Sequence, residues 1–206
     1  MIYEMRTDTF ATGGHVKDFI SKFGEAIEHR NTFSRLGALW TTEIGPLNQV
    51  IHIWPYESLQ ERNEVRAAVA KDGNWPPKGI GGLLGEEVEV LNPAPFMRPW
   101  GAVQELGKVY EVRTYMCKPG SIREMIKRWG ESVPHREKYS PMAACWYTEF
   151  ATQFKWVHVW PYADLDERSR IRAEAAENPH WPPPTGEFIV RMDSRIVAPA
   201  PFSTMR

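Results

Sequence analysis

Apolar and polar residues alternate along this chain in short blocks with two different periods. The first half contains blocks of mixed apolar, aromatic and β-branched residues, which are typical of strands, at residues 2–9, 36–43, 49–54 and 84–91. Between these blocks apolar residues recur every three or four positions, which predicts two helices, over residues 16–34 and 57–71. The expected order of elements is therefore βαββαβ, an antiparallel sheet with both helices on one face.

The second half repeats the first. The run Tyr-Glu-Met-Arg-Thr at residues 3–7 returns as Tyr-Glu-Val-Arg-Thr at 110–114, an offset of 107 (110 − 3). The run His-Ile-Trp-Pro-Tyr returns after an offset of 106 (158 − 52). Such a period is far longer than the roughly 20 to 50 residues of a solenoid repeat. We therefore predict two related ferredoxin-like domains, at residues 1–97 and 108–206, joined by a linker at 98–107.

An open sheet with helices on one face leaves its other face uncovered. The tethered twin is the partner at the highest effective concentration, so we expect the two sheets to pack face to face within one chain. Side chains alternate along a strand, which places His52 and Trp54 opposite Ile51 and Ile53. We assign the two isoleucines to the helix side, and His52 and Trp54 to the space between the sheets.

Composition excludes several classes of protein. Of 206 residues, 42% are hydrophobic and 25% charged, which is ordinary for a globular protein. A net charge of −1 with mixed signs argues against the basic stripe of a nucleic-acid-binding protein. No apolar run reaches the roughly 18 residues of a membrane span, and the N-terminus lacks the pattern of a signal peptide. We expect a cytoplasmic protein that binds neither nucleic acid nor membrane, with two free thiols, Cys117 and Cys145.

Three motifs recur in the same order in both halves, and together they resemble the NIPSNAP family. They are Tyr-Glu-x-Arg-Thr, followed in the second half by a Pro-Gly turn; Trp-x-Thr-Glu; and His-(Ile/Val)-Trp-Pro-Tyr. The resemblance covers nearly the whole chain and implies a dimeric α/β-barrel fold built from tandem ferredoxin-like domains. It implies no settled reaction. Relatives that share the barrel include cofactor-free monooxygenases, haem enzymes and degradative isomerases.

His52 and His158 are the candidate catalytic residues. Each lies in the middle of a predicted strand next to a tryptophan, where it could act as a general base or as a ligand to haem iron or another metal. The alternative is a buried histidine that is hydrogen-bonded across the sheet. No second metal-ligating residue accompanies either histidine at short spacing, so we expect no metal site and name no cofactor.

Other repeated residues are candidates for ligand binding. Glu4 and Arg6 share one strand face, which we assign to the space between the sheets, where they could orient a ligand or form a structural ion pair. Glu43 could partner a histidine. The full set of ligand-binding candidates is Trp54, Trp160, Tyr147, Glu4, Arg6, Glu111, Arg113, Glu43 and Glu149.

Three functions stay open at this stage. The first is binding of a small, partly apolar molecule in a cavity lined by Trp and His; the second is a cofactor-independent monooxygenase or isomerase with a histidine base; the third is a structural or interaction protein. We expect one pocket, nearer His158, where Tyr147, Cys145 and Trp156 differ from the first half. We also expect a homodimer or higher homo-oligomer, with helix faces or the Pro-Ala-Pro-Phe segments at the contact.

Overall fold

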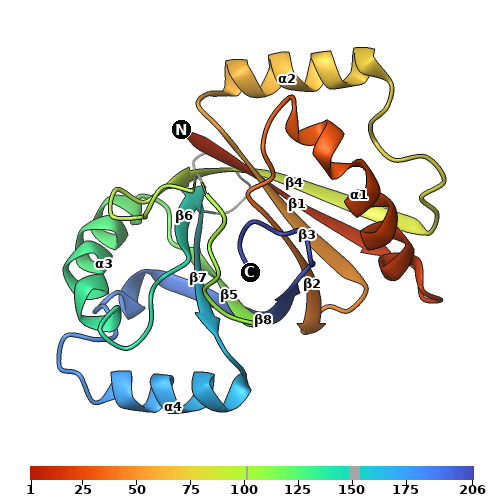
Figure 1. Cartoon of the computed structure of the whole chain (residues 1–206). Coiled ribbons are helices and arrows are strands. Elements are labelled where there is room, and N and C mark those ends of the chain that lie inside the picture. Colours follow the sequence, from red (N-terminus) through yellow and green to blue (C-terminus); the bar gives the residue numbers. More distant parts are fainter. Residues whose placement is uncertain (101, 149–153) are drawn as a thin grey trace.

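The computed structural model describes residues 1–100, 102–148 and 154–206, and each repeat follows the predicted order (Figure 1). The first repeat contains β1 (Ile2–Phe10), α1 (His15–Asn31), β2 (Ala38–Ile44), β3 (Gln49–Tyr56), α2 (Leu59–Asp72) and β4 (Leu83–Pro93). The second contains β5 (Val109–Cys117), α3 (Ile122–Arg136), β6 (Ala144–Thr148), β7 (Phe154–Tyr162), α4 (Leu165–Ala176) and β8 (Ile189–Pro199). A 3₁₀ turn, Gly186–Phe188, precedes β8.

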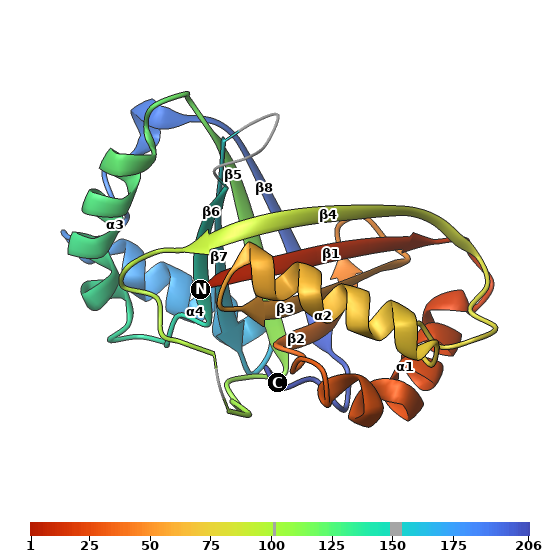
Figure 2. The same ribbon diagram turned by 90° about the horizontal axis from the view of Figure 1, so that it is seen from above.

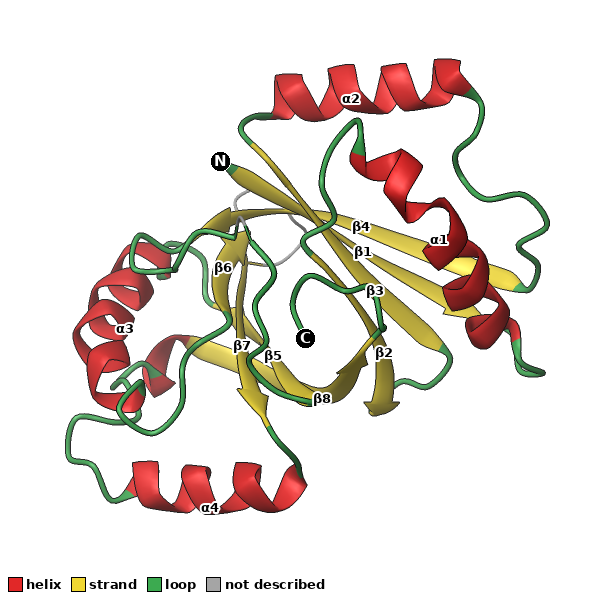
Figure 3. Ribbon diagram, viewed as in Figure 1, coloured by secondary structure: helices red, strands yellow, loops and turns green. Residues whose placement is uncertain are grey.

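The strands form one closed barrel rather than two separate sheets. Their order around the barrel is β1-β3-β2-β8-β5-β7-β6-β4. Antiparallel pairs β2–β8 and β4–β6 join the two repeats, and all four long helices lie outside the strands (Figures 2 and 3). The predicted α+β fold of tandem ferredoxin-like domains in a dimeric α/β-barrel arrangement is confirmed. Among the described residues no helix is both long and apolar enough to cross a membrane.

Matched aromatic residues from the two repeats fill one end of the barrel. The rings of Trp40 and Tyr110 stack with centroids 5.4 Å apart, and those of Tyr3 and Trp146 lie 5.5 Å apart. Trp100, from the predicted linker, inserts edge-on beside Tyr3 at 5.6 Å. The segment between the repeats is therefore part of the core rather than a free connection.

The faces of the strands are the reverse of our assignment. Ile51 and Ile53 lie inside the barrel, whereas His52 and Trp54 pack on the outside against the aromatic residues of α1. Glu4 shares this outer face, because it pairs with Trp54 in the register of β1 and β3. The closed barrel interior holds a cluster of apolar and aromatic residues, and it takes both isoleucines. The outer face is thinly covered and accommodates the polar ones.

Proline has less effect on these elements than we predicted. Strand β3 continues through Pro55 to Tyr56, although we expected Pro55 to end it. Helix α3 likewise continues through Pro134 to Arg136. Local propensity is outweighed at both places by packing in the complete fold.

The phenylalanine of each Pro-Ala-Pro-Phe segment packs against the other repeat of the same chain. Phe96 lies 6.3 Å from the ring of Trp156 in the second repeat. Phe202, in return, stacks on Phe23 of the first repeat at 5.8 Å. These apolar tips are thus used within the chain, and their role as dimer contacts stays a prediction. The homo-oligomer stays a prediction that light scattering can check.

The matched tryptophans of the barrel core provide a test of how the C-terminal segment is held. The Nε1 of Trp40 donates a hydrogen bond of 3.2 Å to the carbonyl oxygen of Met205, whereas Trp146 has no such acceptor among the described residues. Both indoles are fully buried. We expect Trp40→Phe to lower the free energy of unfolding by about 1 kcal/mol more than Trp146→Phe, since only the first removes a buried hydrogen bond; the Met205 carbonyl then keeps only its bond from the hydroxyl of Ser203 at 2.8 Å. Chemical denaturation of both variants measures this, and equal losses would contradict it.

Candidate functional site

A cavity of about 250 Å³ lies between the outer face of the first repeat's sheet and its helices. Its apolar wall comes from α1 and from the Trp-Pro-Pro loop after α2, where Trp75 packs edge-on against Phe23 at 4.8 Å. Its polar floor comes from β1, β3 and β4. The charged and polar lining residues are Glu4, Arg6, Asp8, Arg30, His52, Arg66 and Glu86.

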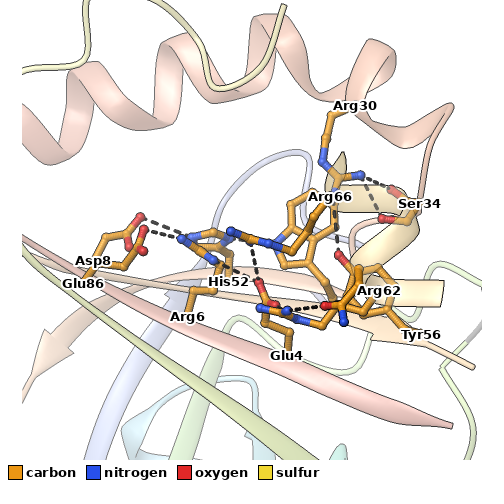
Figure 4. Close-up of polar contacts among 12 residues, drawn as sticks. Glu4, Arg6, Asp8, Arg30, Ser34, His52, Tyr56, Arg62, Arg66 and Glu86 are labelled. Carbon is orange, nitrogen blue, oxygen red and sulfur yellow. Dashed lines mark hydrogen bonds and ion pairs between the residues drawn. The ribbon is translucent and has the colours of Figure 1, made fainter. Parts of the chain in front are cut away.

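At the centre of this floor a buried carboxylate is surrounded by arginines (Figure 4). Glu4 is 1% exposed; its Oε1 accepts from Arg6 at 3.0 Å and from Arg66 at 3.4 Å, and its Oε2 accepts from Arg62. Burial alone would raise the pKa of Glu4, but the arginines outweigh it and lower that pKa. Arg62 and Arg66 reach this carboxylate from α2.

The second repeat contains the same arrangement. Glu111 accepts from Arg113 at 2.8 Å, Arg168 at 2.7 Å and Arg172 at 3.4 Å. Ser194 adds a hydrogen bond of 2.9 Å. Burial opposes ionisation, yet the hydrogen bond from Arg168 and the charges of the three arginines lower the pKa of Glu111 to about 2. These repeated groups are ion pairs between the sheet and the α2 or α4 helix.

Each candidate histidine is held by the tryptophan two residues later. The Nε1 of Trp54 donates to Nδ1 of His52 at 2.8 Å, and Trp160 donates to His158 at 2.7 Å. Because an indole N–H can only donate, Nδ1 must accept, and the hydrogen of a neutral imidazole lies on Nε2. The Nε2 of His52 faces Oδ2 of Asp8 at 3.2 Å. This tautomer leaves neither nitrogen of His52 with a free lone pair.

In each repeat a buried arginine also lies over the ring of this tryptophan. Arg30 lies over the ring of Trp54 at 4.2 Å, donates to Ser34 and reaches the hydroxyl of Tyr56 at 3.4 Å. Arg136 makes the matching contacts in the second repeat. The side chain of Arg30 is buried although it lies near the end of α1, and burial lowers its pKa.

The space that forms the cavity in the first repeat is filled in the second. Asp8 and Phe23 correspond to Tyr115 and Trp129, whose rings lie 4.9 Å and 4.5 Å from the ring of His158. Burial lowers the pKa of His158 well below its usual value. The cavity therefore borders His52, which reverses our expectation of a pocket nearer His158.

The remaining candidates fall outside the cavity. Glu43 is exposed near the end of β2 and accepts from Thr41 at 3.5 Å, so it does not partner His52. Tyr147 packs in the aromatic cluster of the second repeat, beside the buried Cys145. Glu149 lies outside the described residues.

Metal binding and thiol chemistry receive little support from the geometry. Among the described residues no group of three or more His, Cys, Asp or Glu side chains could hold a metal ion. Burial raises the pKa of Cys117 to about 11 and that of Cys145 further above its usual value, so both remain protonated thiols at neutral pH.

Sequence reasoning missed Asp8, Glu86, Phe19 and Phe23, all of which line the cavity. Apart from the residues near His158, we selected site candidates by their recurrence in both repeats, whereas Asp8, Glu86 and Phe23 are replaced in the second repeat. The signal that could have found them was the difference between the repeats at positions flanking the shared motifs.

The two buried carboxylates give a prediction for acid stability. The pKa of Glu111 is near 4.5 when unfolded and about 2 when folded, so its contribution is complete above pH 4.5 and is lost as the pH falls toward 2. A shift of this size corresponds to about 3 kcal/mol. We expect Glu111→Gln to lower the free energy of unfolding at pH 7 by about 3 to 5 kcal/mol, since three arginines lose their counter-charge.

Denaturant unfolding at pH 7 and pH 3 measures this effect. The difference in the free energy of unfolding between wild type and variant should be smaller at pH 3 than at pH 7. At pH 3 the Glu111 carboxylate stabilises the wild-type protein much less. Glu4→Gln is the matched comparison in the first repeat. If Glu111→Gln lowers the free energy of unfolding equally at pH 7 and pH 3, the variant has lost packing rather than charge.

The similarity to known proteins extends over both repeats. The NIPSNAP family model matches residues 3–98 and 110–204. The chain is 30% identical to the protein NipSnap homolog of Dictyostelium discoideum over 200 residues, 94% of this chain and 83% of that protein. It is 26% identical to human NipSnap homolog 3A over 219 residues, covering 100% of this chain and 86% of the relative.

Two solved structures that match nearly the whole chain are more distant in sequence. A candidate monooxygenase from Lactobacillus acidophilus NCFM superposes with a TM-score of 0.65 at 10% identity, over 97% of this chain and 93% of that one. An anthrone oxidase-like protein superposes with a TM-score of 0.64 at 7% identity, over 100% and 94% of the two chains. At these identities the likeness shows the fold alone.

Proposed function

Since this chain belongs to the NIPSNAP family through both of its repeats, we propose its function from its own geometry: it binds one small, partly apolar molecule in the cavity of the first repeat. The proposal concerns a single site for each chain, because aromatic side chains fill the matching space in the second repeat.

Size and lining support a small organic ligand. An apolar cavity of roughly 150 Å³ is enough to hold benzene. The cavity here measures about 250 Å³, so it suits a ligand somewhat larger than one ring. Phe19, Phe23 and Trp75 offer an aromatic wall, and the strands offer a few convergent polar groups, which is the usual composition of a ligand pocket.

The observation that carries the proposal is an unsatisfied oxygen. Asp8 is 5% exposed, and its Oδ1 has no hydrogen-bond partner among the described residues, whereas its Oδ2 faces His52. A buried polar atom without a partner costs about 1 to 3 kcal/mol. This cost is removed if a bound molecule supplies the missing donor, and Asp8 lines the cavity.

The state of His52 favours binding over proton abstraction. A general base needs a lone pair within hydrogen-bond reach of the proton that it takes. In His52 the Nδ1 lone pair accepts the indole hydrogen of Trp54, and Nε2 faces Asp8. The same lone pair would be needed to ligate haem iron. The histidine is thus positioned to orient Asp8.

The exposed mouth of the cavity allows a test with a matched control. Ala70 of α2 lines the cavity and is exposed, and Ala176 is its equivalent on α4. Ala70→Trp should block the cavity, because the indole adds bulk at the mouth without disturbing the core. Ala176→Trp should change nothing. Ligand-observed NMR with 2-phenylethanol, and native mass spectrometry for a molecule retained through purification, provide the measurements.

We expect wild type and Ala176→Trp to bind the alcohol or retain a molecule, and Ala70→Trp to lose at least about 90% of that signal. Thermal unfolding of the three proteins checks that the variants remain folded. The cavity is not the binding site if wild type neither binds 2-phenylethanol nor retains a molecule through purification. The same conclusion follows if Ala70→Trp binds the alcohol as well as wild type does.

A further inference from the structure

We propose that the ligand is a small organic amine, whose ammonium group binds Asp8 and Glu86 while its apolar body packs on the aromatic wall. This inference rests on the proposed function and adds the chemical class of the ligand.

The cavity floor is divided along strand β1. Glu4, Arg6 and Asp8 point to the same face, and strand geometry separates Glu4 from Asp8 by roughly 13 Å. Glu86 lies directly opposite Asp8 in the register of β1 and β4. Figure 4 shows Asp8 and Glu86 together on one side of Arg6, with Glu4 on the other side.

The positive charges gather at one end of this floor. Arg62 and Arg66 bind Glu4, and Arg30 is held by Ser34 and Tyr56. At the other end, Asp8 and Glu86 form a cross-strand pair of carboxylates. Arg6 is the cation bound there, and it is shared between Glu86 and Glu4.

Two carboxylates opposite each other on neighbouring strands repel, and a cation between them removes the repulsion. An ammonium group carries one positive charge and up to three donors, so it can bond both the free Oδ1 of Asp8 and the carboxylate of Glu86. A carboxylate ligand would instead add a third negative charge at this end.

The second repeat shows that the fold does not require these two acids. Their equivalents are Tyr115 and Met192, which are also paired with each other between β5 and β8. Two other groups are present in both repeats: the glutamate with its arginines, which joins the sheet to a helix, and the histidine with the tryptophan of its own strand. The two acids are thus present in the repeat that has the cavity, and the fold itself does not need them.

The apolar wall suits the remainder of such a molecule. Phe19, Phe23 and Trp75 offer ring faces and edges to an apolar body, and an aromatic face near an ammonium group adds a cation–π attraction of about 0.5 to 2 kcal/mol. A primary amine carried on a ring or a short apolar chain satisfies both ends of the cavity.

Isothermal titration with three probes of similar size tests the class of ligand. The probes are 2-phenylethylamine, 2-phenylethanol and 3-phenylpropanoate, which share a ring and differ in the polar group. We expect the amine to bind at least about tenfold more tightly than the alcohol, because hydrogen bonds to charged groups are stronger, and we expect the carboxylate to bind most weakly.

The variant Asp8→Asn keeps the shape and removes the charge. It should weaken binding of the amine by about tenfold or more while changing binding of the alcohol by less than about threefold. Tyr115→Phe, at the equivalent position of the second repeat, is the control and should leave all three affinities unchanged. If Asp8→Asn does not fold, Glu86→Gln at the half-exposed mouth provides the same comparison with a smaller expected loss.

The outcomes separate this inference from the proposed function. Binding of 2-phenylethanol that Ala70→Trp abolishes, with no preference for the amine, would retain the site and overturn the amine. A carboxylate that binds most tightly would also overturn it. Failure of every probe, together with no retained molecule, would remove both.

Discussion

The pairing of β2 with β8 and of β4 with β6 is the constraint on which the rest of this structure depends. Each repeat on its own is an open sheet with two exposed edges, and these two pairs satisfy the edges of both repeats at once. Once the barrel is closed, each strand has a dry inner face and an outer face under the helices. The aromatic stack of Trp40 with Tyr110, and its counterpart Tyr3 with Trp146, can form only in that closed arrangement.

Closure also explains which part of the fold could be predicted. The order of elements, the repeat and the barrel architecture followed from periodicity and from motifs that recur in sequence. The alternation of β3 correctly grouped His52 with Trp54 and Ile51 with Ile53. Alternation states which residues share a face, but not which face is inside. That choice depends on how well each face is covered, which is a property of the assembled barrel.

The outer face is poorly covered because the second helix of each repeat contributes little apolar surface. In α2 the buried residue is Val69, and in α4 the buried residues are Ile171 and Ala175. A face covered in this way can hold ion pairs such as that of Glu4 with the α2 arginines, because the arginines reach solvent while they neutralise the buried carboxylate. The polar pairs that we placed between the sheets therefore belong outside.

The positions at which the two repeats differ are the most informative about function. Recurrence drew attention to the histidines, tryptophans and Glu-Arg pairs, yet each is present both where there is a cavity and where aromatic rings fill the space. Their shared role must then be one that both repeats need, namely holding helices to the sheet. The exchange of Asp8 for Tyr115 is different, since it replaces a buried, unsatisfied carboxylate with a ring that contacts His158. In the second repeat the unpartnered buried atom is instead the Nε2 of His158, which aromatic rings surround. A position at which the two repeats differ, and at which an unpartnered carboxylate oxygen accompanies a cavity, is a stronger indication of a binding site than any residue on which the two agree.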